Sequence, residues 1–320
     1  MSSDSSGLAP PSADLRQATA ATPGVSWLEK AVLIYGPRKS GTTLLQNLLD
    51  SASELFVYPT EIKLKYFVKR KWGQADDADY YFSRSRIPTI ESERLSLEDY
   101  RAKWRQHALR SDSPGLKALI QSDVLHALES VLPPAPRPEG WCAKEVGGAT
   151  DRILALWFSL FAEPRVLLLL RDPLMSIRAI LNDRRKQKHR LTIAQIVCET
   201  LDSLRVVRAQ LRHLRDPRVH VVLYEDMVAD TQDEMRRISE FLGISYSEHL
   251  THPTILGERV VVATSSRPTT KVFAEQARWQ DGLTLRERLT VGLTAALAAL
   301  FPRYRVDYAA LRRRLAAWGR

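Results

Sequence analysis

The residues best suited to chemistry occur together in one stretch, GPRKSGTT, at Gly36–Thr43. Its two glycines permit a sharp turn and a close approach of the backbone to a ligand. Arg38 and Lys39 supply positive charge. Hydroxyl donors follow at three positions: Ser40, Thr42 and Thr43. Backbone N–H groups, hydroxyls and cations in one short loop predict phosphate binding, although a glycine loop that binds nothing can have a similar sequence.

The flanking residues predict a strand before this loop and a helix after it. Ala31–Tyr35 is an apolar run of strand length, and Thr42–Leu49 has leucines at helical spacing. A strand, a glycine loop and a helix in this order present a helix N-terminus to a phosphate, as in P-loop proteins. In the nucleoside-triphosphate pattern a lysine directly follows the second glycine, and Thr42 takes that place here. The cations inside the loop suit neutralisation of charge on a leaving-group oxygen.

Two further apolar runs end in polar residues. Arg165–Leu170 is followed by Arg171, and His220–Leu223 is followed by Tyr224. Strands alternating with helices predict an α/β fold, a three-layer sandwich with a central, mostly parallel sheet and helices on both faces. The carboxyl ends of parallel strands meet at one edge of the sheet, so the loop, Arg171 and Tyr224 should share a site. Arg171 could grip a phosphate there, or form a surface salt bridge with Asp172.

Periodicity predicts further helices at Ser122–Leu132, Asp151–Phe161, Thr192–Leu214 and Thr231–Leu242. Asp151 is the expected N-cap of the second of these, and Gly243 the expected C-cap of the last. The domain organisation predicted is a disordered tail at residues 1–24 and a single domain at 25–320. Residues 60–135 are expected to form a substrate-side insertion outside the sheet.

Composition limits the class of protein. With 320 residues, 44% of them hydrophobic, the chain can bury a large core, and its net charge of +10 favours anionic ligands. Nucleic acid is not expected as a partner, because aromatic residues are not interleaved with the basic stretches. Two cysteines and seven histidines show no disulfide framework or metal-ligand spacing. The longest uncharged apolar run, Leu289–Phe301, is too short for a membrane span, and a cytoplasmic location is predicted.

The loop sequence PRKSGTTLL resembles the 5′-phosphosulfate loop of the sulfotransferases, which use 3′-phosphoadenosine 5′-phosphosulfate (PAPS) as donor. VLLLLRDP and VVLYEDMVAD are similar to two further segments of that family, as are EFLGI and RWQDGLT. The resemblance implies that Arg171 holds the 3′-phosphate, that Tyr224 lies near the adenine, and that Lys39 faces the bridging oxygen. It implies that the loop residues bind the 5′-phosphosulfate: Arg38, Lys39, Ser40, Gly41, Thr42 and Thr43.

The chain departs from the family pattern at two places on the 3′-phosphate side. The family usually has a serine where this chain has Ala179, so Ser176 or Arg178 would have to replace that contact. Some members also have an Arg-Lys-Gly triplet near the C-terminus, and this chain has Arg267 and Lys271 in a similar region instead. These two residues are candidates for donor binding, and a solvated loop explains them equally well.

A general base must accept the proton of the acceptor. Many family members use a histidine two residues after a lysine, and here Lys144 matches the lysine while valine replaces the histidine. Carbohydrate sulfotransferases often use a glutamate soon after the first helix, and Glu61 lies in a similar setting. Glu61 is therefore the first candidate, Glu145 the second, and Lys144 would steady the sulfonate. Alternatively, Glu61 is a surface residue paired with Lys63 or Lys65.

The predicted function is transfer of a sulfonate group from PAPS to a hydroxyl or amine acceptor. Basic residues at 63–71 and 184–190 suggest an anionic acceptor such as a glycan or a small metabolite, and the aromatic cluster Tyr80–Phe82 could line its pocket or belong to the core. An ATP-dependent P-loop kinase, or a sulfotransferase fold without activity, are the alternatives. The sequence predicts no oligomeric state.

Overall fold

Five parallel strands form the central sheet of the protein. The structure is a computed structural model, and it describes residues 26–74, 76–84, 115–131, 138–260, 262–263, 268–269, 272 and 277–317. Their order is β2-β3-β1-β4-β5. The strands are β1 (Ala31–Gly36), β2 (Leu55–Glu61), β3 (Gly140–Val146), β4 (Arg165–Leu170) and β5 (Val219–Leu223). The chain passes from β1 to β2 on one side of β1 and later crosses from β3 to β4 on its other side, so the sheet has a topological switch point beside β1.

Both faces of the sheet are buried, because each strand supplies apolar side chains alternately to its two faces. In β1, Leu33 and Tyr35 contribute to one core cluster, while Val32 and Ile34 contribute to the other. The continuous apolar run of β4 does the same. This burial explains why these strands have no polar alternation in the sequence.

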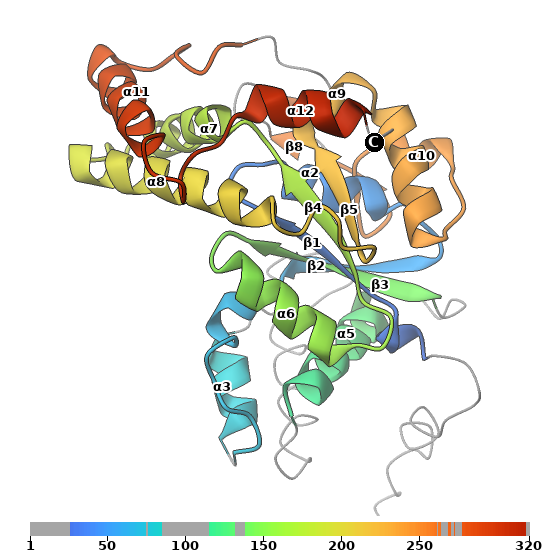
Figure 1. Cartoon of the computed structure of the whole chain (residues 1–320). Coiled ribbons are helices and arrows are strands. Elements are labelled where there is room, and N and C mark those ends of the chain that lie inside the picture. Colours follow the sequence, from blue (N-terminus) through green and yellow to red (C-terminus); the bar gives the residue numbers. More distant parts are fainter. Residues whose placement is uncertain are drawn as a thin grey trace, which may run out of the picture.

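Helices cover the two faces and complete a three-layer α/β fold (Figure 1). One core cluster includes residues of α5 (Leu116–Val131), α6 (Thr150–Leu160), α8 (Ile193–Gln210) and α12 (Tyr308–Ala317). The other includes residues of α2 (Thr42–Leu49), α9 (Tyr224–Ala229) and α10 (Thr231–Leu242). The predicted fold class is therefore confirmed.

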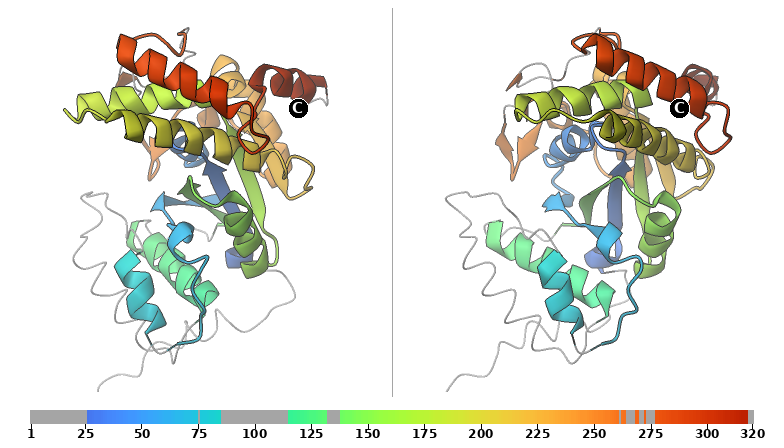
Figure 2. Two further views of the ribbon diagram at one scale, coloured as in Figure 1. Left: turned by 60° about the vertical axis from the view of Figure 1, so that its left-hand side comes forward. Right: turned by 90° about the vertical axis from the view of Figure 1, so that its left-hand side faces the viewer.

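A third apolar cluster joins α7 (Pro173–Lys186), α8 and α11 (Leu285–Ala298). Its buried members include Ile177 and Ile196, with Val291 from α11. The views in Figure 2 place α11 outside α7 and α8, as the last layer on that side of the molecule. Pro173 is the first residue of α7, where its missing N–H costs no hydrogen bond.

The remaining elements are short and lie outside the main sheet. They are α3 (Asp77–Arg84), the 3₁₀ helices η1 (Trp27–Glu29), η2 (Leu64–Tyr66) and η3 (Glu248–Thr251), and the strand pairs β6–β7 (Thr254–Ile255, Glu258–Arg259) and β8–β9 (Val262–Ala263, Pro268–Thr269). Among the helices described, none has the length and apolar character that a bilayer crossing requires.

The predicted helices are found with shifted ends. α5 begins at Leu116 rather than Ser122, while α10 has the predicted bounds and ends at Gly243 in a left-handed conformation. The predicted N-cap Asp151 is wrong. Ala149 caps α6, and Asp151 lies in the first turn, where its carboxylate binds Arg212 and His213. The predicted tail at 1–24 lies outside the described residues, as does much of the predicted insertion, and this domain division stays a prediction.

Candidate active site

The glycine loop between β1 and α2 is shaped by residues in left-handed conformations. Lys39 has a φ of 60° and Gly41 a φ of 100°. At Gly41 a side chain is excluded for a second reason, because an added Cβ would lie 2.7 Å from Cε2 of Tyr224. The Tyr224 ring thus lies directly against the loop, and only glycine permits this approach.

Arg171 joins the ends of three strands. Its guanidinium Nη1 donates to the backbone carbonyl of Lys39 at 2.6 Å, and its Cζ lies 4.1 Å from the centroid of the Tyr224 ring. The surface salt bridge with Asp172 is not the arrangement seen, since the Asp172 carboxylate accepts from the amide of Leu174 and caps α7. The loop after β1, the first residue after β4 and the first after β5 therefore meet, as the sequence predicted.

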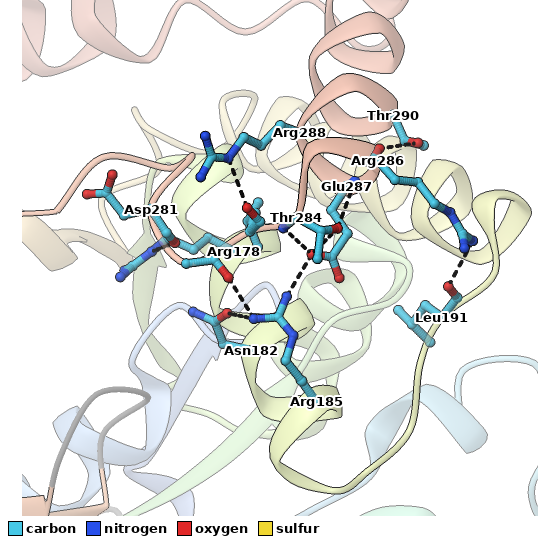
Figure 3. Close-up of polar contacts among 12 residues, drawn as sticks. Arg178, Asn182, Arg185, Leu191, Asp281, Thr284, Arg286, Glu287, Arg288 and Thr290 are labelled. Atoms are coloured by element: carbon cyan, nitrogen blue, oxygen red, sulfur yellow. Dashed lines mark hydrogen bonds and ion pairs between the residues drawn. The ribbon is translucent and has the colours of Figure 1, made fainter.

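Several buried polar atoms near this junction have no hydrogen-bond partner within the described part of the chain. They are Ser40 Oγ, Arg171 Nε and Ser176 Oγ. Ser176 lies in the first turns of α7, and buried Ala179 offers no polar atom there. Arg178, the other candidate, donates from Nε to the carbonyl of Asp281 (Figure 3). Of these two candidates, Ser176 has a buried hydroxyl that no described residue engages, and its contact with a phosphate stays a prediction.

Both cations of the loop are paired with carboxylates of neighbouring helices. Arg38 Nη1 lies 2.6 Å from Glu199 Oε1 of α8, and Lys39 Nζ lies 3.1 Å from Asp183 Oδ1 of α7. Both side chains of the loop remain about 40% exposed. Sequence reasoning did not identify these two acids, because nothing local links position 38 or 39 to helices so much later in the chain.

A cavity of about 460 Å³ opens beside the junction, with Arg171 and Tyr224 in its wall. The other walls come from residues that sequence reasoning gave no role: Glu225, Trp279, Tyr308 and Arg312 among them. The side chain of Lys39 does not line this cavity, although its carbonyl contacts Arg171.

The C-terminal helix α12 is fixed over the cavity by polar contacts. The Tyr308 hydroxyl donates to Glu225 Oε2 at 2.5 Å, and Glu225 Oε1 accepts from the amide of Asp172 at 3.1 Å. Arg312 forms an ion pair with Asp226. Burial, and then the charge of Glu225, raise the pKa of Tyr308, so the hydroxyl stays protonated and remains a donor.

On the other side of the loop, Lys144 connects β3 to α2. Its Nζ donates to Thr43 Oγ1 at 2.9 Å, and burial lowers the pKa of this lysine to about 8. Glu61, at the end of β2, is the register partner of Lys144, so the first candidate base lies next to this pair. The Glu61 carboxylate forms an ion pair with buried Lys63, which is one of the two pairings that the sequence left open.

Glu145, the second candidate base, projects to the opposite face of the sheet, because adjacent residues of a strand alternate. It is fully buried, and its Oε1 accepts from the amide of Val146 at 3.2 Å. Burial raises its pKa to about 7, against the opposing charges of Lys65 and Lys63. The side chain of Lys144, which binds Thr43, and the side chain of Glu145 therefore lie on opposite faces of the sheet.

Comparison with family models matches residues 31–248 to the model described as "Sulfotransferase family". The chain belongs to the sulfotransferase family. The match spans the loop, Arg171 and Tyr224, and it ends before the segment that forms α11 and α12. A comparison with curated proteins finds no significant match.

Two solved structures share the fold of this sulfotransferase. The sulfotransferase domain from the Synechococcus PCC 7002 olefin synthase has a TM-score of 0.51 at 17% identity, covering 83% of this chain and 94% of that one. The sulfotransferase domain from the curacin biosynthetic pathway has a TM-score of 0.50 at 16% identity, covering 86% of this chain and 98% of that one. At these identities the likeness establishes the fold alone.

The remaining candidate residues of this sulfotransferase are Tyr81, Arg267 and Lys271. Tyr81 is buried, donates to Asp123 Oδ2 at 2.8 Å and stacks on Phe67, so it serves core packing rather than an acceptor pocket. Arg267 and Lys271 lie outside the described residues. Within the residues that are described, no group of three or more His, Cys, Asp and Glu side chains could hold a metal ion.

Proposed function

We propose that this sulfotransferase moves a sulfonate group from PAPS to a hydroxyl or amine acceptor by in-line displacement. The observation that carries the proposal is the contact of Arg171 with the Lys39 carbonyl and the Tyr224 ring. This contact unites a phosphate-binding loop, a cation and an aromatic face at the switch point of a parallel sheet, where such sheets bind nucleotides.

The chemistry of the residues fits a doubly phosphorylated nucleotide. Ser40 Oγ, Arg171 Nε and Ser176 Oγ are buried donors without partners in the described chain, and unpaired buried polar groups are costly. Anionic phosphate oxygens would satisfy them. The adjacent cavity has the size of small-molecule sites and offers the aromatic side chains of Tyr224 and Trp279 to a base.

Each residue then has a role in the transfer, which breaks the bond between sulfur and the bridging oxygen and forms one between sulfur and the acceptor. Lys39 would neutralise the departing phosphate oxygen. Lys144 and Thr43, which are hydrogen-bonded to each other, would orient the sulfonate. Glu61, which is paired with Lys63, would accept the proton of the acceptor hydroxyl.

For the acceptor we propose an anionic glycan or small metabolite. The basic residues at 63–71, which follow Glu61, would place positive charge at the acceptor end of the site. Lys63 is buried there and paired with Glu61. Positive charge in a cleft raises the local concentration of an anionic substrate.

Transfer of labelled sulfonate from PAPS to a panel of glycans, phenols, lipids and peptides tests this function. Product with at least one class is expected, and no transfer to any would favour the inactive-fold alternative. Adenosine 3′,5′-bisphosphate should raise the melting temperature, whereas ATP with Mg²⁺ should not. The opposite pattern would support the kinase alternative and contradict the proposal.

A further inference from the structure

Helix α11 exposes a row of large apolar side chains. Eight large hydrophobic residues of the described chain are exposed, and six of them lie in or just after this helix: Leu285, Leu289, Leu293, Leu297, Leu300 and Phe301. We call these six residues the leucine ridge. Four of the leucines are spaced by four, which places them along one side of the helix. Apolar surface that is contiguous and exposed marks an interaction site.

The leucine ridge faces away from α7 and α8. Val291 and Ala298 are the buried residues of α11, and they turn the opposite side of the helix inward. Figures 1 and 2 show α11 as the outer layer over α7 and α8. The ridge ends in Leu300, 76% exposed, and Phe301, 54% exposed, at the turn after the helix. An outermost helix whose exposed side is apolar suits insertion into a surface.

Positive charge borders the leucine ridge. Residues 284–305 contain four arginines and one acid, Glu287. Glu287 is already paired with Arg185 of α7 at 2.7 Å, and Arg286 donates to the carbonyl of Leu191 at 3.4 Å (Figure 3). These contacts bring the basic run at 184–190 beside the N-terminal half of α11. The charged residues exposed in this run are basic: Arg185, Lys186, Lys188 and Arg190.

We propose that the leucine ridge docks this protein on a membrane surface that contains anionic lipids. The ridge would enter the boundary between headgroups and acyl chains, and the bordering arginines and lysines would contact lipid phosphates. This surface function is separate from sulfonate transfer and does not depend on the donor or the acceptor.

A second copy of the chain fits the ridge less well. A two-fold contact would bring two like-charged borders together. The helix has 14 residues, which gives a length of about 21 Å. With a width of roughly 10 Å it covers far less than the roughly 800 Å² per partner of a stable interface. An anionic membrane matches both the bordering charge and the narrow, outward-facing apolar surface.

The test is co-sedimentation of the full chain with vesicles of phosphatidylcholine alone and of phosphatidylcholine mixed with phosphatidylserine. Binding is expected to the mixed vesicles and not to phosphatidylcholine alone, and it should weaken as salt rises. Leu293→Glu and Leu297→Glu should each lose most of this binding. The matched control is Tyr66→Glu, which places the same charge at an exposed apolar residue of η2, beside α3 and far from α11.

Thermal unfolding of each variant shows whether the fold is kept, which is expected because the replaced side chains are exposed. No binding to the mixed vesicles, equal binding to both kinds, or binding that both leucine variants retain would overturn the proposal. So would a dimer in light scattering that Leu297→Glu dissociates, since a second copy would then cover the ridge. Binding that appears only after removal of residues 1–25 would assign the ridge to that segment instead.

Discussion

The ammonium of Lys39 lies 3.1 Å from the carboxylate of Asp183, so the lysine proposed to act on the bond that breaks is paired with an acid of α7. A departing phosphate oxygen and the Asp183 carboxylate would compete for the same cation. The ion pair should therefore lower the affinity for the donor, and it also holds the loop against α7.

Replacement of Asp183 should strengthen donor binding. In Asp183→Asn the ammonium of Lys39 loses its competing anion, and adenosine 3′,5′-bisphosphate should bind a few-fold more tightly by calorimetry. The gain is limited because partly exposed ion pairs contribute about 1 kcal/mol or less. Asp233→Asn, which removes an acid paired with Arg237 on α10, should leave this affinity unchanged.

Lys39→Ala should abolish transfer, and normal turnover in that variant would refute the role of Lys39.

The guanidinium of Arg171 should be irreplaceable even by another cation. Arg171→Lys keeps the charge, but lysine has no planar group that could stack on Tyr224 while it donates to the Lys39 carbonyl. Affinity for adenosine 3′,5′-bisphosphate should fall at least about tenfold, or roughly 1.4 kcal/mol. The same change at Arg165, which stacks on Phe241 at the opposite, amino end of β4, is the control. An unchanged affinity in Arg171→Lys would contradict the assignment of Arg171 to phosphate binding.

Two glycines with nearly the same φ angle separate backbone strain from steric crowding. Gly41 has a φ of 100° and Gly73 a φ of 101°, but an added Cβ meets Tyr224 at Gly41 and nothing within 4 Å at Gly73. Gly73→Ala should therefore cost about 1–2 kcal/mol of stability through its left-handed conformation alone. Gly41→Ala should cost more and should also weaken donor binding, because Tyr224 must move. Equal melting temperatures and equal donor affinities for the two variants would argue against the close approach of Tyr224 to the loop.

The junction of the loop, Arg171 and Tyr224 was predictable from the sequence for a physical reason. Each of the three follows a buried apolar run, and parallel strands bring their carboxyl ends to one edge. Neither step needs a long-range contact. The parallel topology alone therefore predicts that the carboxyl ends of these three strands form one site. The family resemblance adds the identity of the expected ligand.

The partners of these residues could not be predicted in the same way. Asp183 and Glu199 approach the loop because α7 and α8 pack beside it, and Tyr308 reaches Glu225 across 83 positions. Such contacts depend on how helices dock, which the local pattern does not encode. The pairing of Glu61 with Lys63 was one of two local alternatives, and no sequence pattern indicates the left-handed conformation that Lys63 adopts.

The two candidate bases can be distinguished by kinetics. Glu61 is in register with Lys144, which binds Thr43 of α2, whereas Glu145 faces the other side of the sheet. Glu61→Gln should lower kcat by roughly 10²–10⁴-fold, as expected for loss of a general base, with a smaller change in donor affinity. If Glu145→Gln gives that loss and Glu61→Gln does not, Glu145 is the base.

The buried carboxyl of Glu145 should also leave a signature in the pH dependence of stability. Burial raises its pKa from 4.5 to about 7, so between these values the folded state holds a proton that the unfolded state has lost. The contribution of Glu145 to stability is therefore complete below about pH 4.5 and is lost as pH rises toward about 7. The loss is on the order of 3 kcal/mol, from 1.36 kcal/mol for each unit of pKa.

Urea unfolding of the wild type and of Glu145→Gln at about pH 4, 5, 6 and 7 measures this effect. Stability of the wild type relative to Glu145→Gln should fall across that range, because glutamine cannot titrate. Glu54→Gln is the matched control with the opposite sign. The Ser245 amide lowers the pKa of Glu54, so its contribution is present above the unfolded pKa and declines as pH falls. A wild-type minus Glu145→Gln difference that is constant with pH would mean that this carboxyl is not buried as described.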